Sequence, residues 1–118
     1  MIGTFEIKTT SNDRFVFNLK AGNGEVVLTS NILPTKEEAA AVVASVKSNA
    51  PFDGQYERKV GSNDKPYFVL KATDGQVLGR SEMYSSHSSM ENGIKSVMRN
   101  AATATIKDLT EVEEPAHK

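Results

Sequence analysis

The chain contains one stretch twice, and this repetition limits the possible folds more than any other feature. Ser11–Gly24 reads SNDRFVFNLKAGNG and Ser62–Gly75 reads SNDKPYFVLKATDG, at an offset of 51 residues. The same offset aligns Phe5–Ala50 with Tyr56–Ala101 without a gap, with 16 identities in 46 positions. A constant spacing without insertions indicates a duplicated structural unit. Because one unit alone buries too little surface, we expect the two units to share one core.

Composition and charge narrow the class of protein. The chain has 118 residues, a formal net charge of −1 and no cysteine. The charge gives no reason to expect nucleic acid or an anionic membrane as a partner, and disulfides and cysteine metal sites are excluded. The first residues lack the pattern of a secretory signal, and no apolar run approaches the length of a membrane span, so we expect a cytoplasmic protein.

The first repeat begins with a pattern that is typical of strands. Apolar and polar residues alternate in Gly3–Lys8 and again in Arg14–Lys20, and Glu25–Thr29 follows as a returning strand. Between the last two, Asn23 and Gly24 predict a tight primed hairpin turn with positive φ at both residues. The sequence therefore predicts a three-stranded antiparallel meander.

The pattern then changes to the period of a helix. Thr35 and Glu38 have the spacing of a capping box, and the segment continues to Asn49 before Pro51. The second repeat predicts a helix that starts at Ser86 or Ser88 and continues to about Asn100. The apolar stripes of the two helices are offset by 51 residues and comprise Ala39, Val43, Val46 and Ala50, and Met90, Ile94, Val97 and Ala101.

The second repeat adds further expectations. Its strands are predicted at Gln55–Val60, Lys65–Lys71 and Gln76–Arg80, and Thr103–Leu109 is long enough for one more strand. Gly93, inside the second helix, is interpreted as a close contact between helix and sheet. We expect one domain at residues 1–110, with repeats at about 4–54 and 55–110, followed by a disordered acidic tail at 111–118.

These motifs resemble a known family. Ser62–Tyr84 and the segment ENGIKSVMRNA at Glu91–Ala101 are similar to the YegP-like family of small uncharacterised bacterial proteins, and the likeness covers about Phe5–Leu109. The resemblance implies a tandem β-β-β-α-β repeat whose two copies build one antiparallel sheet and exchange their C-terminal strands. Pro51–Lys59 would then close the first repeat and open the second. The family brings no assigned activity, and so it implies no catalytic residues.

The sequence contains few candidates for catalytic, metal-binding or anion-binding residues. His87 is interpreted as a solvated surface residue, because no second histidine or cysteine lies at ligand spacing; we expect no metal and no cofactor. Asp13 and Asp64 are interpreted as turn formers and not as a carboxylate pair. The serines around His87 are expected helix caps. The same segment offers one candidate anion site at a helix start, formed by Ser86, His87 and Ser88.

The sheet face opposite the helices is the strongest candidate for a binding surface. Alternation places on it a set of polar residues that is partly identical in the two repeats: Glu6, Lys8, Lys20, Glu57, Lys59, Tyr67 and Lys71. Cross-strand ion pairing explains these identities structurally, and a partner surface explains them too. A contiguous apolar patch formed by Val16, Tyr67 and Val69 would favour binding.

The sequence thus predicts an α+β protein with about seven antiparallel strands and two helices on one face. The favoured function is a small, non-catalytic binding or interaction module that uses the exposed sheet face. We expect a monomer with internal pseudo-two-fold symmetry, with no membrane contact and an unknown partner. The alternatives are an RNA or single-stranded nucleic-acid binder and an enzyme with an unrecognised site near His87.

Overall fold

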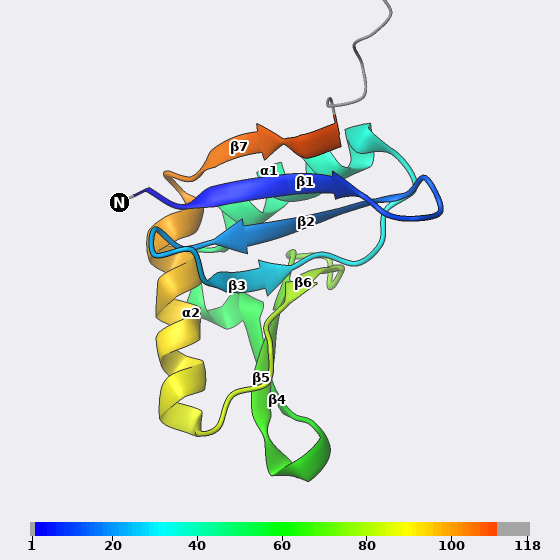
Figure 1. The fold of residues 1–118 in the computed structure, drawn as a ribbon. Helices are drawn as coiled ribbons and strands as arrows, with labels where there is room; N and C mark the ends of the chain where they lie inside the picture. Colours follow the sequence, from blue (N-terminus) through cyan, green and yellow to red (C-terminus); the bar gives the residue numbers. More distant parts are fainter. Residues whose placement is uncertain (1, 111–118) are drawn as a thin grey trace, which may run out of the picture.

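The computed structural model describes residues 2–110 and consists of one seven-stranded sheet and two long helices (Figure 1). The sheet order is β4-β5-β6-β3-β2-β1-β7. The strands are β1 (Thr4–Thr9), β2 (Phe15–Lys20), β3 (Val26–Thr29), β4 (Tyr56–Val60), β5 (Pro66–Lys71), β6 (Val77–Arg80) and β7 (Thr105–Asp108). The helices are α1 (Lys36–Asn49) and α2 (His87–Ala101), with short 3-10 turns at Asp53–Gln55 and Ser62–Asp64.

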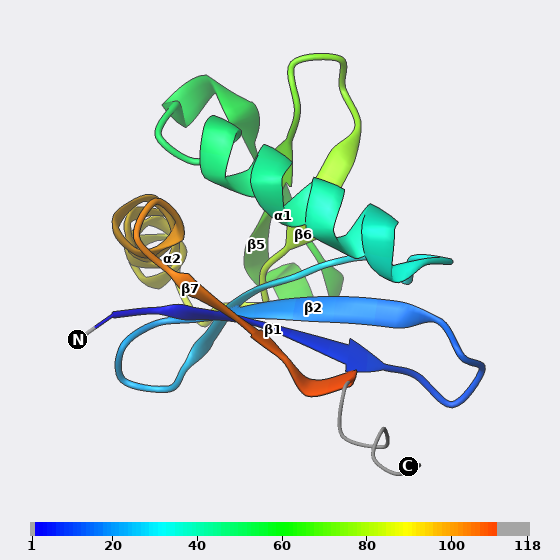
Figure 2. The ribbon, with the colours of Figure 1, turned by 90° about the horizontal axis from the view of Figure 1, so that it is seen from above.

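The two helices lie on the same side of β1 and β2, as Figure 2 shows. Each helix packs on strands of both halves of the chain: α1 contacts β2, β5 and β6, and α2 contacts β2, β3 and β5. Figure 1 also shows that the sheet twists strongly, so that β5 runs steeply across the direction of β2. The predicted α+β class, strand number and helix number are therefore confirmed.

The prediction of a wholly antiparallel sheet is wrong, because β7 pairs with β1 in parallel. The other pairings, including Thr29 with Arg80 between β3 and β6, are antiparallel. Thr29 and Arg80 are 51 residues apart, so equivalent positions of the two repeats face each other in the middle of the sheet. Because β1 and β7 are the first and last strands of the described chain, all the elements between them form the long connection that a parallel pair needs.

The hairpin turns differ from the predicted type. Gly24 and Gly75 have φ of +89° and +90°, whereas Asn23 and Asp74 do not have positive φ. The Gly24 amide donates to the Ala21 carbonyl, and the Ala21 amide donates to the Glu25 carbonyl. This is the three-residue hairpin in which the glycine sits in the left-handed region after an ordinary turn. The requirement for glycine is confirmed, and the requirement for positive φ at the preceding residue is not.

The helix starts follow the predicted capping. Thr35 Oγ1 accepts a hydrogen bond from the Glu38 amide at 3.0 Å, and Ser86 Oγ accepts one from the Ser89 amide at 3.1 Å. Asp13 and Asp64 have φ of +60° and +59°, which supports their interpretation as turn residues. Pro66 is the first residue of β5, where its missing amide proton costs no ladder bond.

Both predicted helical stripes are buried against the sheet. All eight stripe residues have at most 2% of their surface exposed, and Val42 joins them at 9%. From the sheet, equivalent aromatic pairs meet edge to face at 5.7 Å between ring centroids: Phe5 with Phe17, and Tyr56 with Phe68. Tyr56 Oη also donates to the Ala50 carbonyl at 2.7 Å, which fixes the end of α1. The two repeats therefore contribute matching halves of one core.

Two predicted segments are shorter than expected. The last strand covers Thr105–Asp108 within the predicted Thr103–Leu109, and Pro51–Lys59 contains a strand only from Tyr56 onward. This strand, β4, pairs with β5 of the second repeat alone and forms an edge of the sheet. The predicted tail at 111–118 lies outside the described residues.

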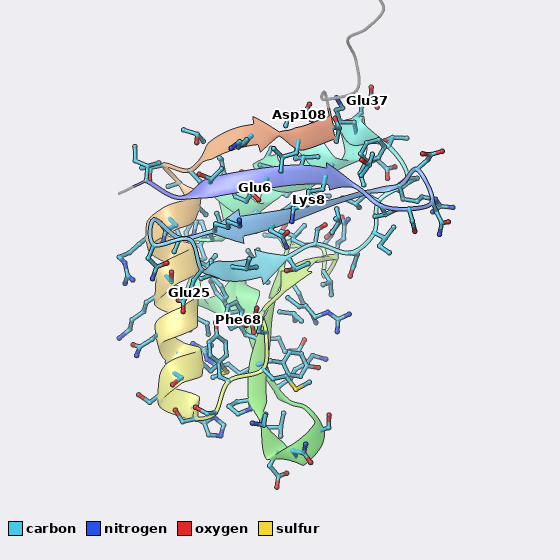
Figure 3. All side chains as sticks on the ribbon, viewed as in Figure 1. Glu6, Lys8, Glu25, Glu37, Phe68 and Asp108 are labelled. Carbon is cyan, nitrogen blue, oxygen red and sulfur yellow. The ribbon has the colours of Figure 1, made fainter. Side chains whose placement is uncertain are left out.

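Asp108 connects the last strand to the start of α1 (Figure 3). Thr110 donates to its carboxylate, and Lys36 Nζ lies 2.9 Å from Oδ2; these contacts lower the Asp108 pKa to about 2. A folded-state pKa below the unfolded value stabilises the fold above about pH 4, and this contribution disappears as the pH falls toward 2.

We therefore predict that Asp108→Asn lowers the free energy of unfolding near neutral pH and has little effect near pH 2. Because the Asp108 side chain is still 30% exposed and solvent screens its charge, the loss near neutral pH is small. Urea unfolding of both proteins across this pH range measures the difference. If the difference in free energy of unfolding between the parent protein and Asp108→Asn stayed constant with pH, the lowered pKa of Asp108 would be contradicted.

Candidate functional site

The sheet face opposite the helices gathers charged side chains from six strands. Strand register places all seven predicted surface residues on it, because Lys8 pairs with Val16, Lys59 with Tyr67, and Lys71 with Val77. Figure 3 shows Glu6 and Lys8 on this side of β1, with the helices behind the sheet. The register adds residues that alternation alone does not assign: Val26, Thr29, Val77, Arg80 and Lys107.

The charges on this face are unbalanced. It carries six basic residues (Lys8, Lys20, Lys59, Lys71, Arg80 and Lys107) and two acidic residues (Glu6 and Glu57). The formal charge of the face is therefore +4, whereas the whole chain has −1. Folding separates positive charge onto one side of a nearly neutral protein.

Half of these basic residues are engaged in ion pairs. Lys20 lies 3.2 Å from Glu6, and Glu57 contacts both Lys71 and Lys59. The hydrogen bond from Lys71 lowers the Glu57 pKa, and the charges of Lys59 and Lys71 act in the same direction. Among residues 2–110, no side-chain hydrogen bond or ion pair engages Lys8, Arg80 or Lys107. These three cations are available to a partner.

A hollow of about 300 Å³ lies in this face. Val69 and Val77 contribute apolar surface, and Tyr67 contributes an aromatic ring. Its lining residues are Asn31, Lys59, Tyr67, Val69, Lys71, Val77 and Arg80. An apolar floor within a basic rim suits an anionic partner that also presents an apolar group.

Val16, Tyr67 and Val69 do not form the contiguous apolar patch that would have favoured binding. Strands β6 and β3 lie between β5 and β2, and the polar pair of Arg80 and Thr29 occupies this position on the face. Neighbouring strands are about 4.8 Å apart, so Val16 is well beyond contact with Val69. Charge, and not a continuous apolar surface, distinguishes this face.

The candidate anion site lies at the start of α2, away from the basic face. Ser86 caps the helix and its hydroxyl donates to Ser89 Oγ, while His87 and Ser88 are the first two residues of the helix and are exposed. Within the described residues His87 and Ser88 have no side-chain hydrogen bond. The condition for an enzyme, a buried His87 beside a cleft, is not met. No cluster of ligand side chains among residues 2–110 is suited to a metal ion.

A larger hollow of about 580 Å³, which sequence reasoning missed, lies between α2 and the turn that joins β2 to β3. Glu25 and Val27 line it from the first repeat, and Asn92 and Arg99 line it from the second. The local sequence pattern could not predict this hollow, because its two walls come from segments about 70 residues apart.

Fold and surfaces together define a small α+β protein made of two similar halves in one mixed sheet. The description "Domain of unknown function (DUF1508)" belongs to the family that matches residues 11–57 and 62–108, one copy on each repeat. The chain belongs to this DUF1508 family, and the predicted resemblance and tandem repeat are confirmed.

Several relatives are similar to this chain along nearly its full length. A UPF0339 protein of Shewanella oneidensis is 53% identical over 93% of this chain and 100% of its own length, and YegP of Escherichia coli K12 is 47% identical over the same shares. The solution structure of a Shewanella oneidensis UPF0339 protein has a TM-score of 0.90 at 50% identity and covers 100% of both chains. That of E. coli YegP, described as a protein of unknown function, has a TM-score of 0.88 over 93% of this chain and 95% of its own.

Proposed function

We propose that the protein is a non-catalytic binding module whose basic sheet face binds an acidic polypeptide segment. The observation that supports this most is the separation of charge: a face with a formal charge of +4 on a chain of −1. Such a face attracts and orients an anionic partner at short range. Lys8, Arg80 and Lys107 supply cations that folding leaves without a partner within residues 2–110.

The hollow favours a polypeptide over a nucleic acid. Its apolar floor of Val69 and Val77 suits one apolar side chain, and only one aromatic ring, Tyr67, borders it. Proteins that bind single-stranded nucleic acids without sequence preference stack successive bases on several aromatic side chains. An acidic segment with a leucine or phenylalanine in its middle would place charge on the rim and the apolar group in the hollow.

Reversal of single charges tests this proposal. The probe is a fluorescein-labelled peptide of about ten residues, glutamates with one central leucine, which spans roughly 33 Å when extended. We expect Lys8→Glu and Arg80→Glu each to weaken binding about tenfold in fluorescence anisotropy, because each replaces an attractive charge with a repulsive one. Raising the salt from about 50 mM to about 200 mM should weaken binding to the parent protein as well.

Lys95→Glu is the matched control, since it makes the same charge change on exposed α2. It should change the affinity less than twofold. If Lys95→Glu weakened binding as much as Arg80→Glu, the attraction would be one of net charge and the sheet face would not be the site.

A single-stranded nucleic-acid binder is the second candidate, and Tyr67 among Lys59, Lys71 and Arg80 favours it. A labelled oligothymidine of about ten nucleotides, measured beside the peptide, separates the two. Tighter binding of the oligonucleotide, together with a loss of affinity of about tenfold in Tyr67→Ala, would favour the nucleic acid.

We also propose that the two repeats exchange their C-terminal strands and that the chain is a cytoplasmic monomer. The pairing of β7, from the second repeat, with β1, from the first, supports the exchange. A duplicated chain already contains both halves of the shared core, which supports the monomer. Among residues 2–110, no helix has the length and apolar character needed to cross a bilayer.

A further inference from the structure

The hollow beside α2 has features of a small-molecule site that is separate from the basic sheet face. It has a volume of about 580 Å³, within the range of pockets that hold small ligands. Figure 3 shows Glu25 at the hairpin end of the sheet, beside α2. The polar lining residues that matter here are Glu25, Tyr84, Ser89, Asn92, Ser96 and Arg99.

One polar stripe of α2 forms a wall of this hollow. Ser89, Asn92, Ser96 and Arg99 follow one another in steps of three, four and three residues, which places them on one side of the helix. The apolar stripe of the same helix is buried in the core. The helix therefore presents hydrogen-bonding groups and a guanidinium to the hairpin of the first repeat.

Charged groups of opposite sign line the hollow without pairing. Among residues 2–110, no hydrogen bond or ion pair engages the side chains of Glu25, Asn92 or Arg99, or the Tyr84 hydroxyl. Burial raises the Tyr84 pKa, and the charges of Glu82 and Glu25 act in the same direction. Glu25 and Arg99 thus lie in one hollow, and a ligand that carries both charges would complement them.

The first repeat contains the equivalent hollow in a different form. It has about 250 Å³, and its lining residues, each 51 positions from a residue of the larger hollow, are Leu33, Glu38, Ala41, Val42, Ser45 and Gln76. Where it has Leu33, Ala41 and Gln76, the larger hollow has Tyr84, Asn92 and Glu25. The two equivalent hollows therefore differ, and the one beside α2 is larger and has more polar and charged groups.

Gly93 helps to form this difference. A Cβ atom at Gly93 would lie 2.3 Å from Tyr84 Oη, whereas Val42 occupies the equivalent position opposite Leu33. The glycine therefore allows the tyrosine hydroxyl to approach the helix backbone at the edge of the hollow. The tyrosine ring is held in place by stacking on Phe68, at 6.4 Å between centroids.

From this geometry we infer that the hollow binds a small zwitterion of the amino-acid class. Its ammonium group pairs with Glu25 and its carboxylate with Arg99, and Asn92 and the Tyr84 hydroxyl donate further hydrogen bonds. A ligand with one charge would leave the opposite protein charge without a partner. The inference does not depend on what binds the sheet face.

Titration with ω-amino acids of increasing length tests the inference. Amide NMR spectra of the labelled protein are recorded with glycine, β-alanine, 4-aminobutyrate and 6-aminohexanoate, and with butyrate and butylamine as controls of one charge. We expect at least one amino acid to shift the amides of Glu25 and Asn92–Arg99, and to bind about tenfold more tightly than either control.

Variants at the two charges complete the test. Glu25→Gln and Arg99→Gln should each weaken binding of the best amino acid about tenfold. Glu38→Gln, in the equivalent hollow, and Lys95→Gln, on exposed α2, remove the same charges and should leave binding unchanged. Equal binding of butyrate, an unchanged affinity in Glu25→Gln, or no shift at these amides with any probe would each overturn the inference.

Discussion

Replacing Gly93 with valine is expected to lower the free energy of unfolding by about 2–3 kcal/mol, as forced overpacking typically does. A Cβ at this position would lie 2.3 Å from Tyr84 Oη, 2.7 Å from Cζ and 3.3 Å from a ring carbon of Phe68. Phe68 is fully buried and Tyr84 stacks on it, which limits how far the two rings can move. The interpretation of Gly93 as a close contact of the helix is supported, and its neighbours are aromatic side chains.

The first repeat indicates which second substitution should relieve the overpacking caused by Gly93→Val. Val42 there lies in the same hollow as Leu33, so the double variant Tyr84→Leu/Gly93→Val reproduces a combination that this fold already accommodates. We expect the double variant to lose at least 1 kcal/mol less than the sum of the two single variants. Urea unfolding of the four proteins measures this coupling energy; additive losses would contradict the proposed contact.

The second large effect is expected at two equivalent serines, Ser30 and Ser81, which are 8% and 7% exposed. Ser30 Oγ accepts from the Phe17 amide at 2.9 Å, and Ser81 Oγ accepts from the Phe68 amide at 3.0 Å. Each hydroxyl also donates to the next carbonyl. Ser30→Ala and Ser81→Ala each leave a buried amide without a partner, so each should cost about 1–3 kcal/mol.

Ser45→Ala is the matched control for these variants. Ser45 is also identical in the two repeats, but it lies half-buried on α1 and its hydroxyl has no hydrogen bond within residues 2–110. Alanine favours the helix, so we expect no loss of stability. Thermal or urea unfolding provides the comparison, and equal losses at Ser30 and Ser45 would contradict the role assigned to the buried hydroxyl.

Periodicity and repetition made most of the fold predictable. The alternation in Phe5–Lys8 and Phe15–Lys20 is specific to strands, and the stripe from Ala39 to Ala50 is specific to a helix. The fixed offset then assigned the same elements to the second repeat, even where Pro66 replaces an aromatic residue. The caps Thr35 and Ser86 were predictable because they depend on local chemistry alone.

The parallel pairing of β7 could not be predicted from its residues, because a strand does not encode the direction of its neighbour.

Strand register also explains why simple alternation did not place every residue on the correct face of the sheet. β-Bulges shift the pairing next to Leu19 and Leu70, so that Val27 and Leu28 both point toward the core. Simple alternation therefore did not assign Arg80 to the exposed face.

The basic sheet face was predictable only in part, because β-bulges interrupt the simple alternation of exposed and buried residues. The seven candidate binding residues followed from alternation, but the excess of positive charge depends on Arg80 and Lys107 as well. The hollow beside α2 was not predictable, because polar residues on one side of a helix are typical of a solvent-exposed surface. Only the folded chain brings Glu25 opposite Arg99.

The most direct measurement of the central proposal is an amide NMR titration of labelled protein with the acidic peptide that contains one leucine. The proposal predicts shifts on the basic face, at Lys8, Val16–Lys20, Tyr67–Lys71 and Arg80, with little change on α1 and α2. Shifts that cluster on the helices, or no shifts at saturating peptide, would contradict the assignment of the sheet face as the binding surface.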